Sequence, residues 1–208
     1  MKTRLITTLF IILTGITLFA QENKSLLSIQ TGESRLNLGG YISTNLKYSS
    51  WENKPAGFLD LKAAVTFNSK WAVGLSATGL YYDKKLNKIV NDGTYHIYAG
   101  YTGIFLERMF NLTDELILSL GILTGQGEAY YKYDKEYRDG RPWYQEVIDK
   151  ETFSIFEPSV EIQQNIGGNF YLGVSGSYRF SSPLKLTQTD EKALNTFGGG
   201  LSLKYGIF

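Results

Sequence analysis

Apolar and polar residues alternate along most of this chain with a period of two. From Leu36 to Tyr48 the even positions are mostly apolar, whereas the odd positions are small or polar, and the segment from Leu59 to Phe67 repeats the pattern in the odd positions. Successive side chains of a β-strand point to opposite faces, so this alternation predicts strands with one apolar face and one polar face.

Eight segments show the alternation, and each predicts a strand. They cover residues 36–48, 59–67, 71–81, 95–105, 116–122, 156–162, 170–178 and 197–208. Their connections alternate in length, with short turns near 68–70, 111–115 and 166–169 and longer loops near 49–55, 83–93, 131–151 and 182–194. An even number of strands with short turns at one end and long loops at the other is typical of up-and-down outer-membrane barrels.

The alternation alone does not decide which face points outward. A soluble barrel would turn its apolar face inward around a ligand, whereas a membrane barrel turns it toward lipid. Charged residues on the polar face favour a narrow, packed interior, and we assign them to an interior charge network: Asp60, Lys62, Glu157, Glu161, Arg179 and Lys204. Aromatic residues near the strand ends fit the two interfacial girdles of a membrane barrel: Tyr48, Trp71, Tyr81, Tyr95, Phe105, Phe170, Tyr178 and Tyr205. We therefore expect an all-β, eight-stranded antiparallel up-and-down transmembrane β-barrel.

Composition and the first residues support an exported β protein. The chain has 15 Tyr, 12 Phe and 22 Gly but only 4 Pro, which favours strands. Residues 1–20 carry Lys2 and Arg4, an apolar stretch and then Ala20, the pattern of a secretory signal peptide. We assign residues 21–35 to a periplasmic lead-in and residues 36–208 to the barrel. A net charge close to zero gives no basic surface for nucleic acid, and the absence of cysteine excludes a disulfide framework.

The end of the chain resembles the assembly signal of outer-membrane barrels. Residues 196–203 read TFGGGLSL, a polar residue, a glycine two positions later and then alternating apolar residues, and the chain closes on an aromatic. That resemblance assigns the signal to Gly198, Leu201, Leu203, Tyr205 and Phe208, to be read by the barrel assembly machinery. Phe208 departs from the pattern, because it directly follows Ile207 and lies off the alternation of the preceding apolar residues.

Residues 36–208 as a whole resemble the small OmpA/OmpX-type barrels of Gram-negative outer membranes. The resemblance implies an outer-membrane location, with membrane lipid and lipopolysaccharide as surroundings. It does not choose a function, because the group includes adhesion and structural proteins, lipid A-modifying enzymes and subunits of larger assemblies.

The interior charges allow two interpretations. An eight-stranded barrel is just wide enough for its side chains to fill it, so Glu157 and Glu161 are placed to pair with Arg179 on the next strand. Paired charges then form a structural plug, which is the interpretation we prefer. The alternative is a gated small-solute channel.

His96 is the single histidine of the chain and the residue on which an enzymatic alternative depends. A lipid A deacylase needs a histidine and a serine that face lipid, with an acid to orient the imidazole. The alternation places His96 on the inward face, which disfavours that chemistry. We predict no catalytic residues, no metal site and no cofactor.

The third long loop is the most distinctive stretch of the sequence. Asp139-Gly140 lies between two segments rich in aromatic residues, which predicts a hairpin whose strands extend beyond the membrane. Aromatic and arginine side chains dominate binding hot spots, and we select as a candidate partner-binding set Tyr133, Tyr137, Arg138, Arg141, Trp143 and Tyr144. An ordinary loop that rests on lipid headgroups is equally compatible. The sequence thus favours a non-enzymatic structural or interaction protein.

Overall fold

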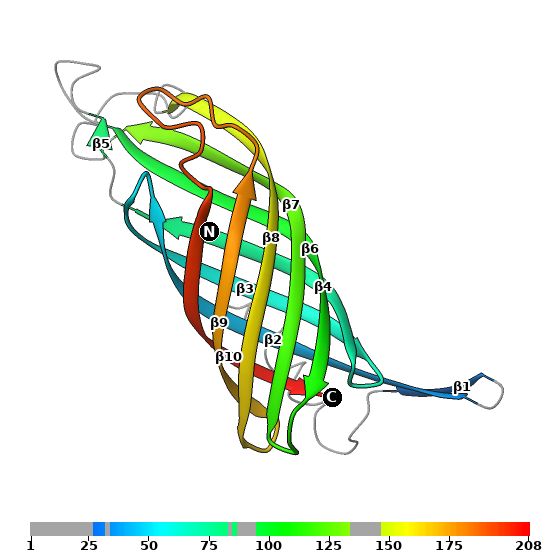
Figure 1. Ribbon diagram of the computed structural model, residues 1–208. Helices are drawn as coiled ribbons and strands as arrows, with labels where there is room; N and C mark the ends of the chain where they lie inside the picture. Colours follow the sequence, from blue (N-terminus) through cyan, green and yellow to red (C-terminus); the bar gives the residue numbers. More distant parts are fainter. Residues whose placement is uncertain (1–26, 32–33, 83–84, 87–94, 134–146) are drawn as a thin grey trace, which may run out of the picture.

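Ten β-strands account for most of the described residues in the computed structural model of this chain (Figure 1). The described residues are 27–31, 34–82, 85–86, 95–133 and 147–208. None of them lies in a helix that is long and apolar enough to cross a membrane. The strands are β1 (Leu27–Thr31), β2 (Ser34–Trp51), β3 (Lys54–Phe67), β4 (Trp71–Tyr81), β5 (Lys85–Leu86), β6 (Tyr95–Asn111), β7 (Leu116–Tyr133), β8 (Val147–Gly167), β9 (Phe170–Ser181) and β10 (Thr196–Ile207).

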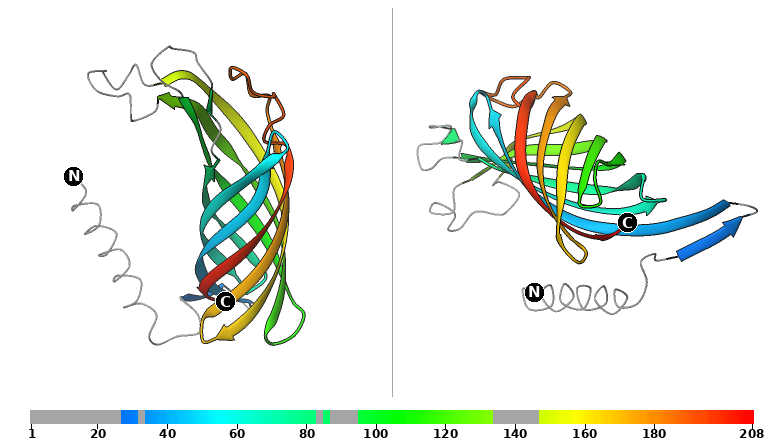
Figure 2. Two further views of the ribbon diagram at one scale, coloured as in Figure 1. Left: turned by 90° about the vertical axis from the view of Figure 1, so that its left-hand side faces the viewer. Right: turned by 60° about the horizontal axis from the view of Figure 1, so that its bottom comes forward.

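Eight of these strands close into a barrel in which every neighbouring pair is antiparallel. Around the ring the order is β2, β3, β4, β6, β7, β8, β9 and β10. The last strand pairs with the first from Gly199 opposite Tyr48 to Ile207 opposite Gly40, and Figure 2 shows β10 lying beside β2. Because neighbours in the sequence are neighbours in space, the predicted eight-stranded up-and-down barrel is confirmed.

Short turns join the strands at one end of the barrel, which we call the short-turn end. Between β3 and β4, Asn68 and Ser69 have φ of 50° and 54°, and the Asn68 side chain accepts from the backbone N–H of Asn37 at 2.9 Å. Between β8 and β9, Gly168 has φ of 57°. Such left-handed residues build tight hairpins, and the C-terminus lies at this end (Figure 1).

The opposite end, which we call the loop end, differs from prediction at its first connection. β2 runs to Trp51 and β3 begins at Lys54, so only Glu52 and Asn53 make the turn, with φ of 50° and 63°. The predicted loop over residues 49–55 is therefore wrong. Ser49, Ser50 and Pro55 have the composition of a loop, yet the strands continue to pair through them.

On seven of the eight barrel strands, the described side chains point inward or outward as the alternation predicted. On the outer face Leu46, Leu75 and Leu201 are 66%, 66% and 62% exposed, whereas their sequence neighbours Lys47, Ser76 and Ser202 are 7%, 4% and 3% exposed. The outer face is thus a band of exposed apolar side chains, as a lipid-facing surface requires.

The predicted phase of β6 is wrong. Tyr95, Ile97, Tyr101 and Phe105 are at most 4% exposed and face the interior, whereas Ile104, 59% exposed, faces outward. Both faces of this strand carry large apolar residues, so alternation does not distinguish them. Tyr95 and Phe105 therefore do not belong to the aromatic girdles, and His96 points to the outer face rather than inward.

A hairpin extends the barrel at the short-turn end. β1 pairs with the beginning of β2, from Leu27 opposite Leu38 to Thr31 opposite Ser34, and the hairpin runs away from the barrel wall (Figure 1). Residues 27–31 of the predicted lead-in thus form a strand that pairs with β2, and residues 34–35 already belong to β2.

Candidate functional site

Among the described residues, eight charged side chains meet inside the barrel, and their charges balance. Four are basic (Lys47, Lys62, Arg179 and Lys204) and four are acidic (Asp60, Glu107, Glu157 and Glu161). The most exposed of them, Lys62, has a side chain only 13% exposed. Buried charges are costly unless they are paired, so equal numbers of each sign are what a closed interior requires.

The first half of this ionic layer centres on Lys47 of β2. Its Nζ lies 2.9 Å from Glu157 Oε1 and 3.2 Å from Asp60 Oδ2. Hydroxyl groups donate to the same carboxylates: Ser76 (2.6 Å) and Thr78 (3.1 Å) to Asp60, and Tyr101 (2.6 Å) and Ser177 (2.7 Å) to Glu157. Both carboxylates therefore have charged and neutral partners, and the group links strands from opposite parts of the ring.

Arg179 completes this half of the layer in an unusual way. Its Nε is 3.7 Å from Glu157 Oε2, and none of its guanidinium nitrogens has a hydrogen-bond acceptor among the described residues. The guanidinium instead lies over the ring of Phe58, 3.9 Å from the centroid, and 5.7 Å from that of Tyr101. Arg179 thus contacts Glu157 of the ionic layer and, through a cation–π contact, the ring of Phe58.

The second half of the layer centres on Glu107 and Glu161, nearer the short-turn end. Lys204 Nζ lies 3.7 Å from Glu107 and 3.6 Å from Glu161, and Lys62 Nζ lies 3.3 Å from Glu107. The Tyr41 hydroxyl donates to Glu107 at 2.5 Å. Glu161 accepts hydrogen bonds from Ser202 and, at 3.1 Å, from Gln163.

All six residues of the predicted charge network lie inside the barrel, and two further charged residues join them. Glu157 is close to Arg179 as expected, whereas Glu161 lies beside Lys204 instead. The sequence analysis did not identify Glu107, because the predicted strand ended at Phe105 and its phase was inverted. Lys47 lies on the predicted polar face of its strand. The sequence does not show that its side chain reaches Glu157 of β8 across the interior, and only the structure reveals this ion pair.

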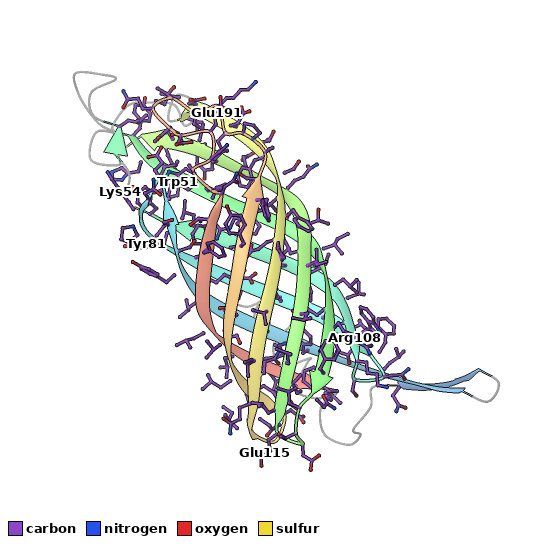
Figure 3. All side chains as sticks on the ribbon, in the orientation of Figure 1. Trp51, Lys54, Tyr81, Arg108, Glu115 and Glu191 are labelled. Atoms are coloured by element: carbon purple, nitrogen blue, oxygen red, sulfur yellow. The ribbon has the colours of Figure 1, made fainter. Side chains whose placement is uncertain are left out.

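An apolar cap covers the ionic layer at the loop end. Its members come from β2, β5, β7 and the segment between β9 and β10, and each is at most 1% exposed: Trp51, Leu86, Ala129, Tyr131, Leu184 and Leu194. The Trp51 ring stacks on Tyr82 with centroids 6.3 Å apart. Figure 3 shows Trp51 at this end of the molecule, close to the segment that carries Glu191.

The segment 182–195 is held over the barrel by polar contacts as well as by the cap. Asp149 of β8 accepts from the Thr187 backbone N–H at 2.6 Å and from its hydroxyl at 2.9 Å. Glu52 accepts from the Asp190 backbone N–H at 2.8 Å, and Tyr131 hydrogen-bonds Thr189 at 2.9 Å. We call this segment the clamped loop, because three different barrel strands or turns hold it.

Aromatic side chains close the interior at the short-turn end. The ring of Phe208 packs edge-on against Tyr171, with centroids 5.0 Å apart, and 5.8 Å from the ring of Tyr41. Phe208 therefore continues the inward phase of Ser202, Lys204 and Gly206, which explains why it lies off the outward alternation. The other residues of the predicted assembly signal lie as expected for the last strand, with Gly198 inward and Leu201 and Leu203 outward. Tyr205 packs against Phe170 with centroids 4.9 Å apart.

The predicted partner-binding loop is described only at its base. β7 runs to Tyr133 and β8 begins at Val147, so both strands extend beyond the predicted segments toward this loop. Tyr137, Arg138, Arg141, Trp143 and Tyr144 lie outside the described residues.

His96 faces outward on β6. Its register partners are Lys85 on β5 and Lys132 on β7. The nearest outward carboxylate on β7, Glu128, lies in a different row and is ion-paired with Lys150 at 2.7 Å. The described residues contain no cluster of three or more metal-ligating side chains.

No protein-family model and no curated protein sequence matches this chain. Solved structures do match it. Neisserial surface protein A is 12% identical and superposes with a TM-score of 0.53, covering 82% of this chain and 96% of its own. The attachment invasion locus protein Ail of Yersinia pestis, in complex with the heparin analogue sucrose octasulfate, is 14% identical with a TM-score of 0.50, covering 81% and 97%. At such identities the likeness is one of fold, that of the small eight-stranded outer-membrane barrels.

Proposed function

We propose that this chain is a non-enzymatic outer-membrane protein whose barrel is closed and whose role is to hold an interaction surface at the cell exterior. The observation that carries the proposal is the filled interior. A balanced ionic layer lies between an apolar cap at the loop end and aromatic rings at the short-turn end. Among the described residues such packing fills the interior, which disfavours the channel alternative.

The loop end is the part that offers a surface to a partner. In outer-membrane barrels the longer connections face the cell exterior, so we expect the clamped loop to face it, together with the ends of β7 and β8 that the structure describes. The clamped loop is anchored by Asp149 and Glu52, and an anchored loop loses little conformational entropy on binding. The aromatic and arginine residues of the β7–β8 connection remain our candidates for direct contact: Tyr133, Tyr137, Arg138, Arg141, Trp143 and Tyr144.

Export and assembly follow from the two ends of the chain. We assign residues 1–20 to a signal peptide and the last strand to recognition by the barrel assembly machinery. The fold likeness to a surface protein and to an attachment protein supports an interaction role. Sucrose octasulfate is a ligand of Ail, and we do not extend it to this chain.

Two measurements test the proposal. Purified barrel in planar bilayers should show no conductance above that of the bare bilayer, whereas a variant with the clamped loop replaced by a short glycine linker should show a higher conductance.

Detergent affinity purification from native membranes should recover a partner with the intact chain. A triple Arg138→Ala, Arg141→Ala, Trp143→Ala variant should lose it, and a Lys185→Ala, Lys192→Ala variant of the clamped loop serves as the charge control. Steady wild-type conductance, or equal recovery by all variants, contradicts the proposal.

A further inference from the structure

The hairpin of β1 and β2 leaves the barrel with one edge that has no strand partner. Each of the eight barrel strands has a neighbour on either side, whereas β1 stands at the end of the strand order and, among the described residues, pairs with β2 alone. The far edge of β1 therefore offers a row of backbone N–H and C=O groups, which is the feature that accepts a further strand.

The hairpin is also thin where it leaves the barrel. β3 joins β2 at Leu38 and β10 joins it at Gly40, so residues 34–37 of β2 have β1 as their single strand neighbour in the described sheet. A two-stranded hairpin is at best marginally stable in water, and further strands are what give a small sheet independent stability. Addition of a strand at the free edge of β1 would therefore stabilise this part of the chain.

The sequence of β1 does not protect its edge. Natural proteins discourage strand addition with charged residues, with proline or with a covering segment. β1 reads LSIQT, with neither a charge nor a proline in its five residues. An uncharged strand pairs with a copy of itself without placing like charges opposite one another.

The orientation of the hairpin is compatible with two barrels in one membrane. Figure 1 shows the hairpin close to edge-on, whereas the right-hand view of Figure 2, turned so that the bottom comes forward, shows its two strands side by side. The plane of the hairpin thus runs across the barrel axis. Adjacent antiparallel strands of two identical chains are related by a two-fold axis perpendicular to the sheet, and here that axis runs along the barrel axis. Two copies related in this way have the same orientation in the membrane, and their β1 strands lie at the same depth.

We infer that β1 pairs with β1 of a second copy, antiparallel and with Ile29 on the two-fold axis. All five residues of β1 are paired in that register, which sets Leu27 opposite Thr31 and Ser28 opposite Gln30. The two hairpins then form one four-stranded sheet in the order β2, β1, β1, β2. A second copy is the occupant that the geometry favours, because it brings an uncharged strand to the same depth in the antiparallel direction.

The dimer goes beyond the proposed function and does not depend on it. Two barrels joined at the short-turn end present two loop ends on the same side of the membrane, so a partner with repeated binding sites gains avidity. Because the tests of the proposed function leave β1 unaltered, the two conclusions can fail separately.

Single cysteines test the register, because the chain has no cysteine of its own. Opposite residues of antiparallel strands have Cα atoms about 4.5–5.5 Å apart, within the range of a disulfide. Ile29→Cys, which lies opposite its own copy, should therefore give a covalent dimer in oxidised native membranes. Leu27→Cys and Thr31→Cys should each stay monomeric, since in this register either residue is displaced from its own copy by about 14 Å along the strands. Co-expression of Leu27→Cys with a differently tagged Thr31→Cys should restore the covalent dimer.

Charged variants test the same contact without a covalent bond. Ile29→Lys places two lysines opposite each other and Ile29→Glu two carboxylates, so each variant alone should lose the dimer in native mass spectrometry of detergent-solubilised barrel. Co-expression of the two with different tags should recover it. Gln30→Lys adds the same charge on the other face of β1, opposite Ser28, and is the control that should stay dimeric.

Heat modifiability on a gel shows that each variant is folded, so loss of the barrel is not mistaken for loss of the dimer. Equal crosslinking of Ile29→Cys, Leu27→Cys and Thr31→Cys overturns the inference, because random collision does not depend on register. A monomeric wild type overturns it as well, and so does capture of a different protein by Ile29→Cys in place of a second copy. Failure of the Lys and Glu variants to dimerise with each other would likewise contradict a symmetric contact at Ile29.

Discussion

Lys47 on β2 and Glu157 on β8 form an ion pair across the barrel interior, with Nζ 2.9 Å from Oε1, although they are 110 positions apart in the chain. Neither strand is a neighbour of the other in the ring. The pair therefore braces the barrel from the inside, independently of the hydrogen bonds between adjacent strands. Both side chains are almost fully buried, so the loss of either one would leave an uncompensated charge in the interior.

Removal of the Lys47 charge should destabilise the barrel strongly. Lys47→Met leaves Glu157 and Asp60 without their shared cation, and an uncompensated buried charge costs about 3–5 kcal/mol. Urea titration of the barrel in liposomes, followed by tryptophan fluorescence, measures the free energy of unfolding. Lys54→Met, an exposed lysine of β3, should stay within about 0.5 kcal/mol of the wild type. Equal unfolding midpoints for the two variants would show that the pair does not brace the barrel.

The alternation in the sequence predicted the strands well because a membrane barrel must keep its outer face apolar. It failed on β6, where Phe105 and Tyr101 fill the interior while Ile104 and Leu106 face outward. Large apolar residues on both faces remove the contrast on which the phase depends. Glu107 was missed because it lies beyond Phe105, where the predicted segment ended, and the wrong phase would have placed its side chain outward.

The clamped loop shows a second limit of sequence reasoning. Residues 182–194 have the polar composition of an ordinary loop, yet Leu184 and Leu194 are at most 1% exposed. Their partners in the cap come from other strands, and no local pattern records such contacts. Three leucines in a polar connection, Leu184, Leu186 and Leu194, were the signal that this segment packs onto the barrel.

Loosening the apolar cap should release the clamped loop while the barrel stays folded. Leu194→Ala removes a buried side chain from the cap, a change that costs about 2–5 kcal/mol in a packed core. Limited proteolysis of intact cells should then cut the loop near Lys185 or Lys192, which the wild type resists. The heat-modifiability shift should persist, because the ring of β2 to β10 does not depend on the cap.

The matched control for this experiment is Lys192→Ala, at an exposed position two residues away. It removes one trypsin site but leaves the cap intact, so cleavage at Lys185 should remain as slow as in the wild type. Cleavage of both variants at the same rate would mean that the cap does not hold the loop.

The contacts of Asp149 give an independent test of the same loop. Asp149→Asn retains an acceptor for the Thr187 backbone N–H but weakens both hydrogen bonds by removing the negative charge. Asp149→Ala removes both. We expect proteolysis rates to rise in the order wild type, Asn, Ala. An Asn variant that is cut as fast as the Ala variant would argue that the loop needs the charge itself and not the hydrogen bonds.

The outward position of His96 calls for a direct test of lipid A chemistry. The register partners of His96 are Lys85 and Lys132, and the outward carboxylate of Glu128 is ion-paired with Lys150, so we propose that the imidazole takes no part in lipid A chemistry. Overexpression should therefore leave the mass spectrum of lipid A unchanged, and His96→Ala should give the same spectrum. A new acylation species that disappears in His96→Ala would establish an enzyme and contradict the proposed function.

Phe208 should contribute to the barrel in two separable ways. Its ring packs against Tyr171 and Tyr41, and aromatic pairs of this kind contribute about 0.5–1.5 kcal/mol each beyond the area that they bury. Phe208→Ala should therefore lower the unfolding free energy of purified barrel refolded in liposomes, where no assembly machinery is present. Gly199→Ala, on the lipid face of the same strand, should not.

The recognition role of Phe208 is tested in cells. We expect Phe208→Ala to reduce the amount of folded barrel in the outer membrane more than Gly199→Ala does. Phe208→Tyr keeps a terminal aromatic ring and should restore most of the yield. Comparison with the liposome result separates the two roles: a loss in cells that equals the loss in liposomes is due to packing alone, because recognition by the machinery acts only in cells. In that case the resemblance of residues 196–208 to an assembly signal would not extend to Phe208.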